Sequence, residues 1–146
     1  MKKAQKPKFK SKSYCVISNS AQETIKFGEK LGKKLKANDV IALSGNLGAG
    51  KTTLMQGLAK GLGVKEYVTS PTFTLINQYK GKILVFHVDL YRLESENQIE
   101  DLGIEEYFKA NGVCVIEWAE RMAKLLPPNA NKIELKYLNE NDRLIS

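Results

Sequence analysis

The sequence contains few of the residues that mark secreted, metal-rich or membrane proteins. It has two cysteines and one histidine in 146 residues, too few for a disulfide scaffold or a zinc site built from cysteine and histidine. Both Cys15 and Cys114 lie in apolar runs typical of strands, so we expect two buried thiols. No apolar run approaches the roughly 20 residues that cross a bilayer, and the lysine-rich start lacks the apolar segment of a secretory signal. These absences predict a cytoplasmic protein that does not enter a membrane.

Positive charge is concentrated at the start of the chain. The net charge is +7, but residues 1–12 carry six lysines and no acid, so the remainder sums to only +1. A segment of this composition cannot bury a core. We therefore predict a disordered basic arm over residues 1–13 and one domain over residues 14–146. A solvated tail is the preferred interpretation of the arm, and contact with RNA or an acidic protein surface is the alternative.

The segment GNLGAGKT at residues 45–52 organises the rest of the chain. It follows a short apolar run and opens into a helical pattern, which is the context of the phosphate-binding loop motif GxxxxGK[ST]. Gly45 and Gly50 permit backbone angles that turn successive amides inward around a polyphosphate. The Lys51 ammonium can reach the β and γ phosphates, and the Thr52 hydroxyl can bind Mg²⁺. The motif predicts a nucleotide site, with a chance match in a glycine-rich turn as the alternative.

Alternating strand and helix patterns predict an α/β fold. Capping patterns at Ser20 and Ser95 open two helices, and the KGK sequence at residues 80–82 predicts an antiparallel hairpin. The expected architecture is a single-domain P-loop NTPase fold with a mixed, mostly parallel sheet flanked by helices and an antiparallel hairpin. The expected strands cover residues 14–18, 40–43, 74–79, 83–88, 113–118, 133–138 and 144–145. The expected helices cover residues 20–36, 51–62, 105–110 and 119–125, and a further helical segment begins at residue 95.

Two acids are candidates for the magnesium site. Metal-assisted phosphate chemistry needs a carboxylate at the carboxyl end of a strand beside the phosphate loop. Asp89 and Glu117 each end an apolar run, and the pattern does not choose between them. Either could instead cap the following helix. The only histidine, His87, is expected to be a hydrogen-bonded structural residue, with a catalytic base as the alternative.

The loop at residues 69–73 is rich in hydroxyl groups. Pro71 disfavours a helix at Ser70, and the hydroxyls of Ser70 and Thr72 could form a loop that senses the γ-phosphate. A simple turn is equally consistent with the spacing. Tyr91 and Trp118 could be exposed recognition residues, although strand aromatics usually belong to the core.

Four segments in order resemble the TsaE family, formerly called YjeE. They are residues 45–52, TSPTFTL at 69–75, HVDLYRL at 87–93 and VIEWAE at 115–120. The resemblance covers nearly everything from residue 14 onward. It implies a compact P-loop fold that binds ATP and Mg²⁺ and hydrolyses ATP slowly alone. It also implies action on the TsaB–TsaD protein pair in the synthesis of threonylcarbamoyladenosine in tRNA. The tRNA is therefore expected to be an indirect partner.

The same resemblance implies roles for individual residues. Lys51 would hold the phosphates, Thr52 and Glu117 would hold Mg²⁺, and Asp89 would lie near the metal or the attacking water, so the catalytic set is Lys51, Asp89 and Glu117. Residues at positions 19–24 would line the adenine side. The expected ATP-binding set is Asn19, Thr24, Gly45, Asn46, Leu47, Gly48, Ala49, Gly50, Lys51, Thr52, Thr53 and Arg143. The expected switch-like or partner surface is Ser70, Thr72, Tyr91, Arg92 and Trp118.

Three other functions are alternatives to this prediction. A GTPase is discounted because NKIE at residues 131–134 has glutamate where the guanine-reading segment needs aspartate. A small-molecule kinase would surround the transferred phosphoryl group with arginines, and this chain has only three. A nucleotide-gated module that binds RNA or protein would bind ATP without appreciable turnover. The sequence favours an ATPase whose hydrolysis cycle controls its association with protein partners.

Overall fold

The computed structural model describes residues 15–71 and 74–146 as an α/β domain, which confirms the predicted fold class. The predicted basic arm at residues 1–13 and the Thr72 hydroxyl lie outside the described residues. The strands are β1 (Val16–Ser18), β2 (Val40–Ser44), β3 (Ile76–Lys80), β4 (Leu84–Asp89), β5 (Gly112–Glu117), β6 (Asn131–Tyr137) and β7 (Arg143–Ile145). The helices are α1 (Ala21–Gly32), α2 (Lys51–Gly61) and α3 (Glu96–Asp101), with 3₁₀ segments η1 (Ile104–Lys109) and η2 (Ala119–Leu125).

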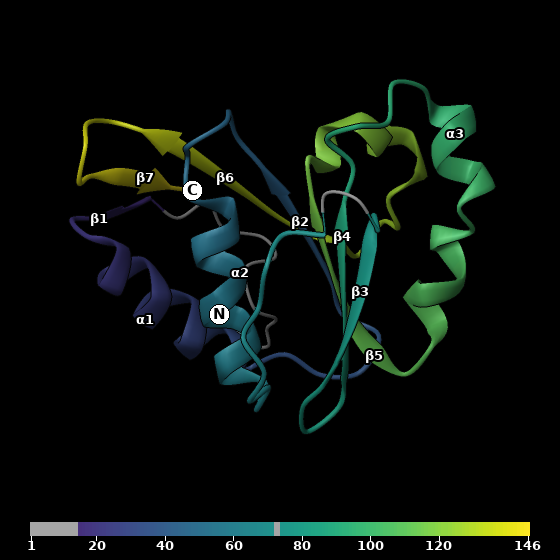
Figure 1. Ribbon diagram of the computed structural model, residues 1–146, viewed down its shortest axis with the longest axis horizontal. Helices are drawn as coiled ribbons and strands as arrows, with labels where there is room; N and C mark the ends of the chain where they lie inside the picture. The colour runs from purple at the N-terminus through teal and green to yellow at the C-terminus, as the bar shows by residue number, and fades with distance from the viewer. Residues whose placement is uncertain (1–14, 72–73) are drawn as a thin grey trace, which may run out of the picture.

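The described strands form one twisted sheet in the order β1-β7-β6-β2-β5-β4-β3 (Figure 1). The four central strands, β6, β2, β5 and β4, are parallel. The outer pairings are antiparallel. The hairpin predicted at residues 80–82 is confirmed as β3–β4, and β6 and β7 form a second hairpin. The phosphate-loop strand β2 lies at the centre, and β5 and β6 are its neighbours. This order brings the carboxyl ends of β2, β5 and β4 to one edge of the sheet.

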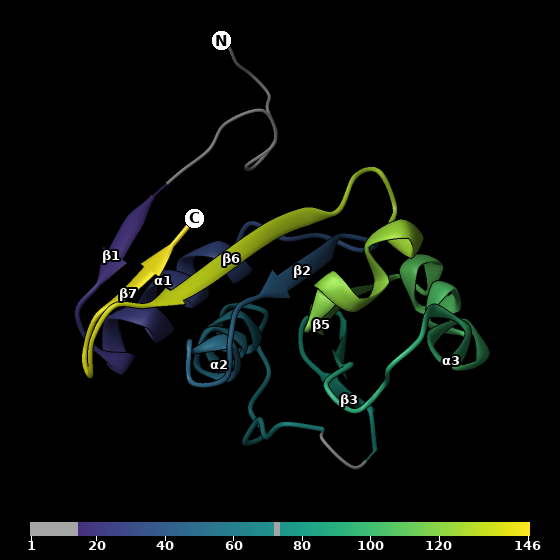
Figure 2. The same ribbon diagram turned by 90° about the horizontal axis from the view of Figure 1, so that it is seen from above.

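Helical segments cover both faces of the sheet (Figure 2). On one face, α1 and α2 pack on alternate residues of the central strands, such as Leu43 and Val115. On the other face, α3, η1 and η2 pack on the intervening residues, such as Ala42 and Ile116. The alternation explains why the central strands read as continuous apolar runs, since both of their faces are buried.

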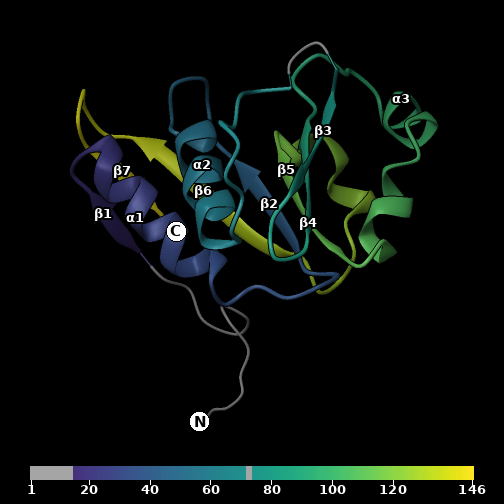
Figure 3. The ribbon, with the colours of Figure 1, turned by 60° about the horizontal axis from the view of Figure 1, so that its bottom comes forward.

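Helices α1 and α2 lie side by side and pack unusually closely (Figure 3). Glycines on both helices make this possible. A β-carbon built on Gly28 of α1 would lie 2.7 Å from the Leu54 carbonyl oxygen and 3.0 Å from the Gly57 Cα of α2. The close contact fixes the first turn of α2, where the phosphate loop ends, against α1.

Several predicted boundaries need correction. The first helix ends at Gly32 rather than residue 36, because Lys34 and Leu35 donate to carbonyls three residues back in a tighter turn. The segment predicted as a short helix at 105–110 is the 3₁₀ segment η1. Cys114 is buried as expected, but the prediction for Cys15 is wrong, because it precedes β1 and is exposed.

Two further boundaries are set by left-handed residues. Leu75 has φ +68°, so β3 begins at Ile76 rather than residue 74. Trp118 has φ +61°, so β5 ends at Glu117 rather than residue 118. Within residues 15–71 and 74–146, no helix has the length and apolar character needed to cross a membrane.

Candidate functional site

A pocket of about 410 Å³ lies at the carboxyl edge of the central strands. It gathers predicted site residues from the phosphate loop, from the ends of β4 and β5, and from the C-terminal hairpin. Its lining consists of Leu47, Gly48, Gly50, Lys51, Thr52, Thr53, Ser70, Asp89, Tyr91, Glu117, Trp118 and Arg143. The topology thus brings together residues that are up to 96 positions apart in the chain. The other motif residues, Gly45, Asn46 and Ala49, belong to the same loop.

The phosphate loop has the backbone that its sequence predicts. Gly45 and Gly50 have φ +143° and +101°, a region closed to most residues with a β-carbon. Gly50 is the N-cap of α2 and has no side chain to cap the helix. The first amides of α2 therefore remain available to an anion at the positive end of the helix dipole.

Lys51 is folded back onto the loop that carries it. Its Nζ donates to the carbonyl oxygens of Gly45 at 2.5 Å and Asn46 at 3.0 Å, and it lies 4.2 Å from the centroid of the Trp118 ring. Burial lowers the Lys51 pKa from its ordinary value of 10.5, whereas the Glu117, Glu120 and Asp89 carboxylates act in the opposite direction. The two carbonyl contacts hold the Lys51 ammonium within the loop, beside the pocket that the residue lines.

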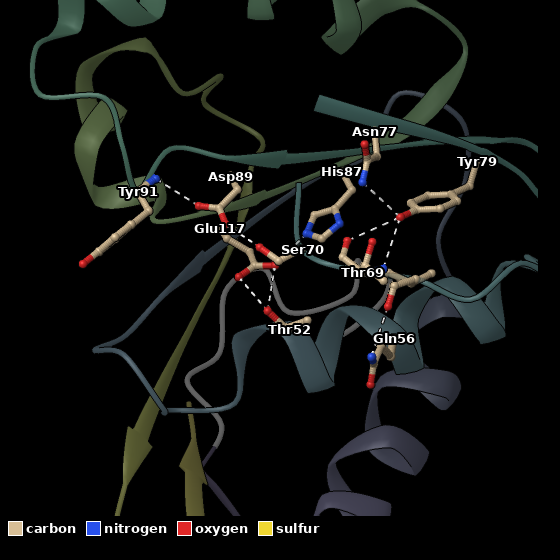
Figure 4. Close-up of polar contacts among 11 residues, drawn as sticks. Thr52, Gln56, Thr69, Ser70, Asn77, Tyr79, His87, Asp89, Tyr91 and Glu117 are labelled. Atoms are coloured by element: carbon tan, nitrogen blue, oxygen red, sulfur yellow. Dashed lines mark hydrogen bonds and ion pairs between the residues drawn. The ribbon is translucent and has the colours of Figure 1, made fainter. Parts of the chain in front are cut away.

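Glu117 contacts the predicted metal ligand Thr52. The Thr52 hydroxyl lies 3.2 Å from Oε1 and 3.3 Å from Oε2 of Glu117 (Figure 4). These are hard oxygen ligands of the kind that Mg²⁺ prefers, and Glu117 is buried beside a pocket able to admit phosphate oxygens. Within the described residues, no three His, Cys, Asp or Glu side chains gather as a metal site. The residues fit a Mg²⁺ held by one hydroxyl, one carboxylate and phosphate oxygens.

Asp89 ends the neighbouring strand but has different partners. Its Oδ2 accepts from the Ser70 hydroxyl at 2.9 Å, and its Oδ1 accepts from the Tyr91 backbone amide at 2.9 Å (Figure 4). Both carboxylate oxygens are therefore engaged by protein donors. Ser70 belongs to the predicted switch-like loop, so this contact ties that loop to the end of β4. The strand pattern alone does not distinguish the two acids, whereas in the structure only Glu117 of the two contacts Thr52.

Aromatic and arginine side chains frame one side of the pocket. The Tyr91 and Trp118 rings lie 5.0 Å apart, and the Arg121 guanidinium lies 5.4 Å from the Trp118 ring. Arg121 also donates to the Leu93 carbonyl at 2.9 Å. The left-handed conformation of Trp118 directs its ring over Lys51. Sequence reasoning missed Arg121, for which no motif supplied a signal.

Arg143 approaches the phosphate loop from β7. Its guanidinium lies over the Tyr137 ring at 4.7 Å and donates to the Asn139 carbonyl at 2.7 Å. A β-carbon built on Gly50 would lie 3.8 Å from the Arg143 Nε. Arg143 therefore lines the pocket, and its implied contact with the nucleotide stays a prediction.

Three predicted site residues are not brought to this pocket. Asn19 is exposed at the start of α1, and Thr24 is buried with its hydroxyl 2.6 Å from that of Ser18. Neither lines the pocket, and the predicted adenine contact stays a prediction. Arg92 is exposed and also lies outside the lining.

The single histidine of the chain contacts a site residue but does not line the pocket. His87 is fully buried, and its Nε2 lies 2.6 Å from Oε2 of Glu117. The structural interpretation of this residue is consistent with its burial. The only sign in the sequence was that His87 lies two residues before Asp89 on an apolar strand, which places both side chains on the same face of the sheet.

Comparison with known proteins gives one consistent result. A family model described as "Threonylcarbamoyl adenosine biosynthesis protein TsaE" matches residues 18–145. A protein named tRNA threonylcarbamoyladenosine biosynthesis protein TsaE from Treponema pallidum is 45% identical over 130 residues, covering 89% of this chain and 96% of the relative. A protein of the same name from Bacillus subtilis is 46% identical over 112 residues, covering 76% of this chain and 70% of the relative.

A solved structure agrees with the sequence comparisons. The crystal structure of YdiB from Bacillus subtilis superposes with a TM-score of 0.78 at 34% sequence identity. The match covers 90% of this chain and 82% of YdiB. The similarity therefore extends over most of the chain.

Proposed function

Because the chain belongs to the TsaE family, we propose that it binds ATP and Mg²⁺ at the phosphate loop and hydrolyses ATP slowly. The hydrolysis cycle supports threonylcarbamoyladenosine synthesis in tRNA by acting on a TsaB–TsaD protein complex in the cytoplasm. The names of the relatives support the pathway. The geometry of the pocket supports the nucleotide site, and the pathway in the relatives' names supports the choice of protein partners.

The contact between Thr52 and Glu117 carries the proposal. It joins the last residue of the phosphate-loop motif to a carboxylate from the adjacent strand, 65 positions later in the chain. A glycine-rich turn without a ligand would need no such contact. In phosphoryl-transfer proteins of this class, a loop hydroxyl and a strand-end carboxylate together hold the metal that neutralises the phosphates.

Each charged residue has a separate part in the proposed reaction. The free amides of the loop and the Lys51 ammonium bind the phosphates, and Lys51 exchanges its two carbonyl contacts for phosphate oxygens. Thr52 and Glu117 would hold Mg²⁺, which when bound would supply positive charge to offset the negative charge of the phosphates. Asp89, fixed by Ser70 and the Tyr91 amide, orients the attacking water.

The mouth of the pocket suits a protein partner. Leu47 in the phosphate loop is 70% exposed, and Tyr91, two residues after the end of β4, is 42% exposed. Both residues line the pocket, with Trp118 between Tyr91 and Lys51. Exposed apolar and aromatic side chains of this kind are enriched where proteins associate. A partner that covers them would contact the nucleotide, which couples binding to hydrolysis.

The test compares ATP binding and phosphate release in matched variants. Lys51→Met removes the ammonium, and we expect a 10- to 100-fold loss of ATP affinity, as a charge-assisted contact contributes about 1.5–3 kcal/mol. Lys60→Met is the control, since Lys60 is exposed on the same helix. Glu117→Gln should abolish the magnesium-dependent part of hydrolysis. Calorimetry measures binding, and phosphate release is measured with and without TsaB and TsaD.

The outcomes separate the proposal from its rivals. Unchanged phosphate release by Lys51→Met would refute the proposed ATPase activity. Efficient phosphorylation of a metabolite would favour the small-molecule kinase. ATP binding without turnover, together with RNA affinity that falls steeply with salt, would favour the nucleotide-gated binding module.

A further inference from the structure

The environment of Glu117 contains one group that the proposed reaction does not use. His87 of β4 lies on the same face of the sheet as Glu117 of β5. His87 is fully buried, whereas Glu117 is buried except for the small part of its side chain that lines the pocket. The Nε2 to Oε2 distance is 2.6 Å, the shortest contact that Glu117 makes with a described side chain. Thr52 and His87 approach the carboxylate from different sides (Figure 4).

The chemistry of the two groups fixes the direction of this hydrogen bond. An ionised carboxylate offers only lone pairs, so the imidazole must supply the proton from Nε2. In the neutral ring the other nitrogen, Nδ1, is then a bare acceptor. Nδ1 of His87 is buried without a hydrogen-bond partner among residues 15–71 and 74–146. A proton on Nδ1 would leave an unpaired buried donor, which costs free energy.

The hydrogen bond has a consequence for the side of the carboxylate that faces the pocket. With Oε2 held by His87, the carboxylate cannot rotate without breaking a buried hydrogen bond, and it stays beside the Thr52 hydroxyl. Without the hydrogen bond from His87, the nearby Lys51 ammonium would compete for the freed oxygen of Glu117. Outer partners that orient a metal-binding side chain typically account for 10- to 100-fold of metal affinity.

We propose that His87 is a positioning residue that holds Glu117 in the orientation needed to bind the metal of a metal–nucleotide complex. The inference rests on the proposed function of the same site. It assigns His87 no proton transfer in the reaction. A side chain that only filled space at this position would affect folding but not metal affinity, and this difference makes the two roles separable.

The first experiment titrates Mn²⁺, observed by electron paramagnetic resonance, into protein saturated with a non-hydrolysable ATP analogue. His87→Leu fills a similar volume without a donor, and we expect Mn²⁺ affinity to fall at least tenfold. His87→Gln restores an N–H donor, and we expect affinity within about threefold of wild type. Analogue affinity in the absence of metal should change less than twofold in both variants. Equal Mn²⁺ affinity in wild type and His87→Leu, or equal losses in both variants, would overturn the proposal.

The second experiment needs no variant and no ligand. The chain has a single histidine, so ¹⁵N-labelled imidazole in untagged wild-type protein gives one unambiguous pair of ring nitrogen signals. We expect the proton on Nε2, and a ring protonated only on Nδ1 would overturn the proposal even if both variants failed to fold. If wild type did not bind the Mn²⁺–analogue complex, the proposed function would fail instead. The two failures are therefore distinguishable.

Discussion

Substitution of Gly28 by alanine tests how closely α1 holds the first turn of α2. The new β-carbon would lie 2.7 Å from the Leu54 carbonyl oxygen and 3.0 Å from both the Gly57 Cα and the Leu58 amide nitrogen. All three contacts are with backbone atoms, so no side chain can rotate away. The helices must separate by several tenths of an ångström, and a gap of that size forfeits a substantial part of the dispersion energy at the interface.

The expected magnitude combines two opposing effects. Alanine in place of glycine inside a helix is stabilising by about 0.5–1 kcal/mol. Overpacking of a close interface is destabilising by about 1–3 kcal/mol. With rigid backbone on the opposing side, we expect Gly28→Ala to lower the free energy of unfolding by about 2 kcal/mol, equivalent to a Tm decrease of roughly 4–8 °C. Urea unfolding and thermal circular dichroism measure the two quantities.

A matched pair of variants isolates the packing effect. Lys26 is exposed on the same helix, so the difference between Lys26→Ala and Lys26→Gly gives the intrinsic preference of α1 for alanine. If Gly28→Ala stabilised the protein by that same difference, the close contact with Leu54 would be refuted. We also expect weaker ATP binding in Gly28→Ala, because Leu54 lies three residues after Lys51 in the turn that carries the phosphate loop.

Three further predictions concern the thiols and the tryptophan. Burial raises the pKa of Cys114 from 9.0 to about 12, so between these pH values the thiol ionises mainly in the unfolded protein. By pH 10 the free energy of unfolding of wild type should therefore fall by about 1.4 kcal/mol more than that of Cys114→Ala, as measured by urea unfolding. Equal decreases in the two proteins would contradict this. At pH 8, a thiol reagent should modify one cysteine, the exposed Cys15, in folded protein and two after unfolding; two in folded protein would contradict the burial of Cys114. A double-mutant cycle between Trp118→Leu and Lys51→Met should give a coupling of about 0.5–2 kcal/mol in urea unfolding, and no coupling would show that the ring does not stabilise the ammonium.

Features specified by neighbouring residues could be predicted from the sequence. The capping pattern at Ser95 is observed in full, since its hydroxyl accepts from the Gln98 amide and the Gln98 side chain accepts from the Ser95 amide. The phosphate loop follows from the same kind of information, because glycine and lysine spacing within eight residues sets both the backbone and the charge. Hairpins with short connections belong to this class as well.

Boundaries set by tertiary contacts were less predictable. Leu75 and Trp118 adopt left-handed backbone conformations that apolar residues rarely take, so no local preference marked them as strand ends. The Leu75 carbonyl accepts from the Asp89 amide, and the Trp118 ring lies over Lys51. In both cases, contacts with a distant part of the chain accompany the unusual local conformation.

The roles of the two strand-end acids depend on strand order, which local sequence does not specify. Asp89 and Glu117 are direct neighbours in the parallel β4–β5 register, and each follows an equally apolar strand. What separates them is that β5 pairs with β2, whose end becomes the phosphate loop, whereas β4 lies one strand further away. One strand spacing is about 4.8 Å, which is more than the length of a hydrogen bond. Glu117 therefore reaches Thr52, and Asp89 is left to the Ser70 hydroxyl and the Tyr91 amide.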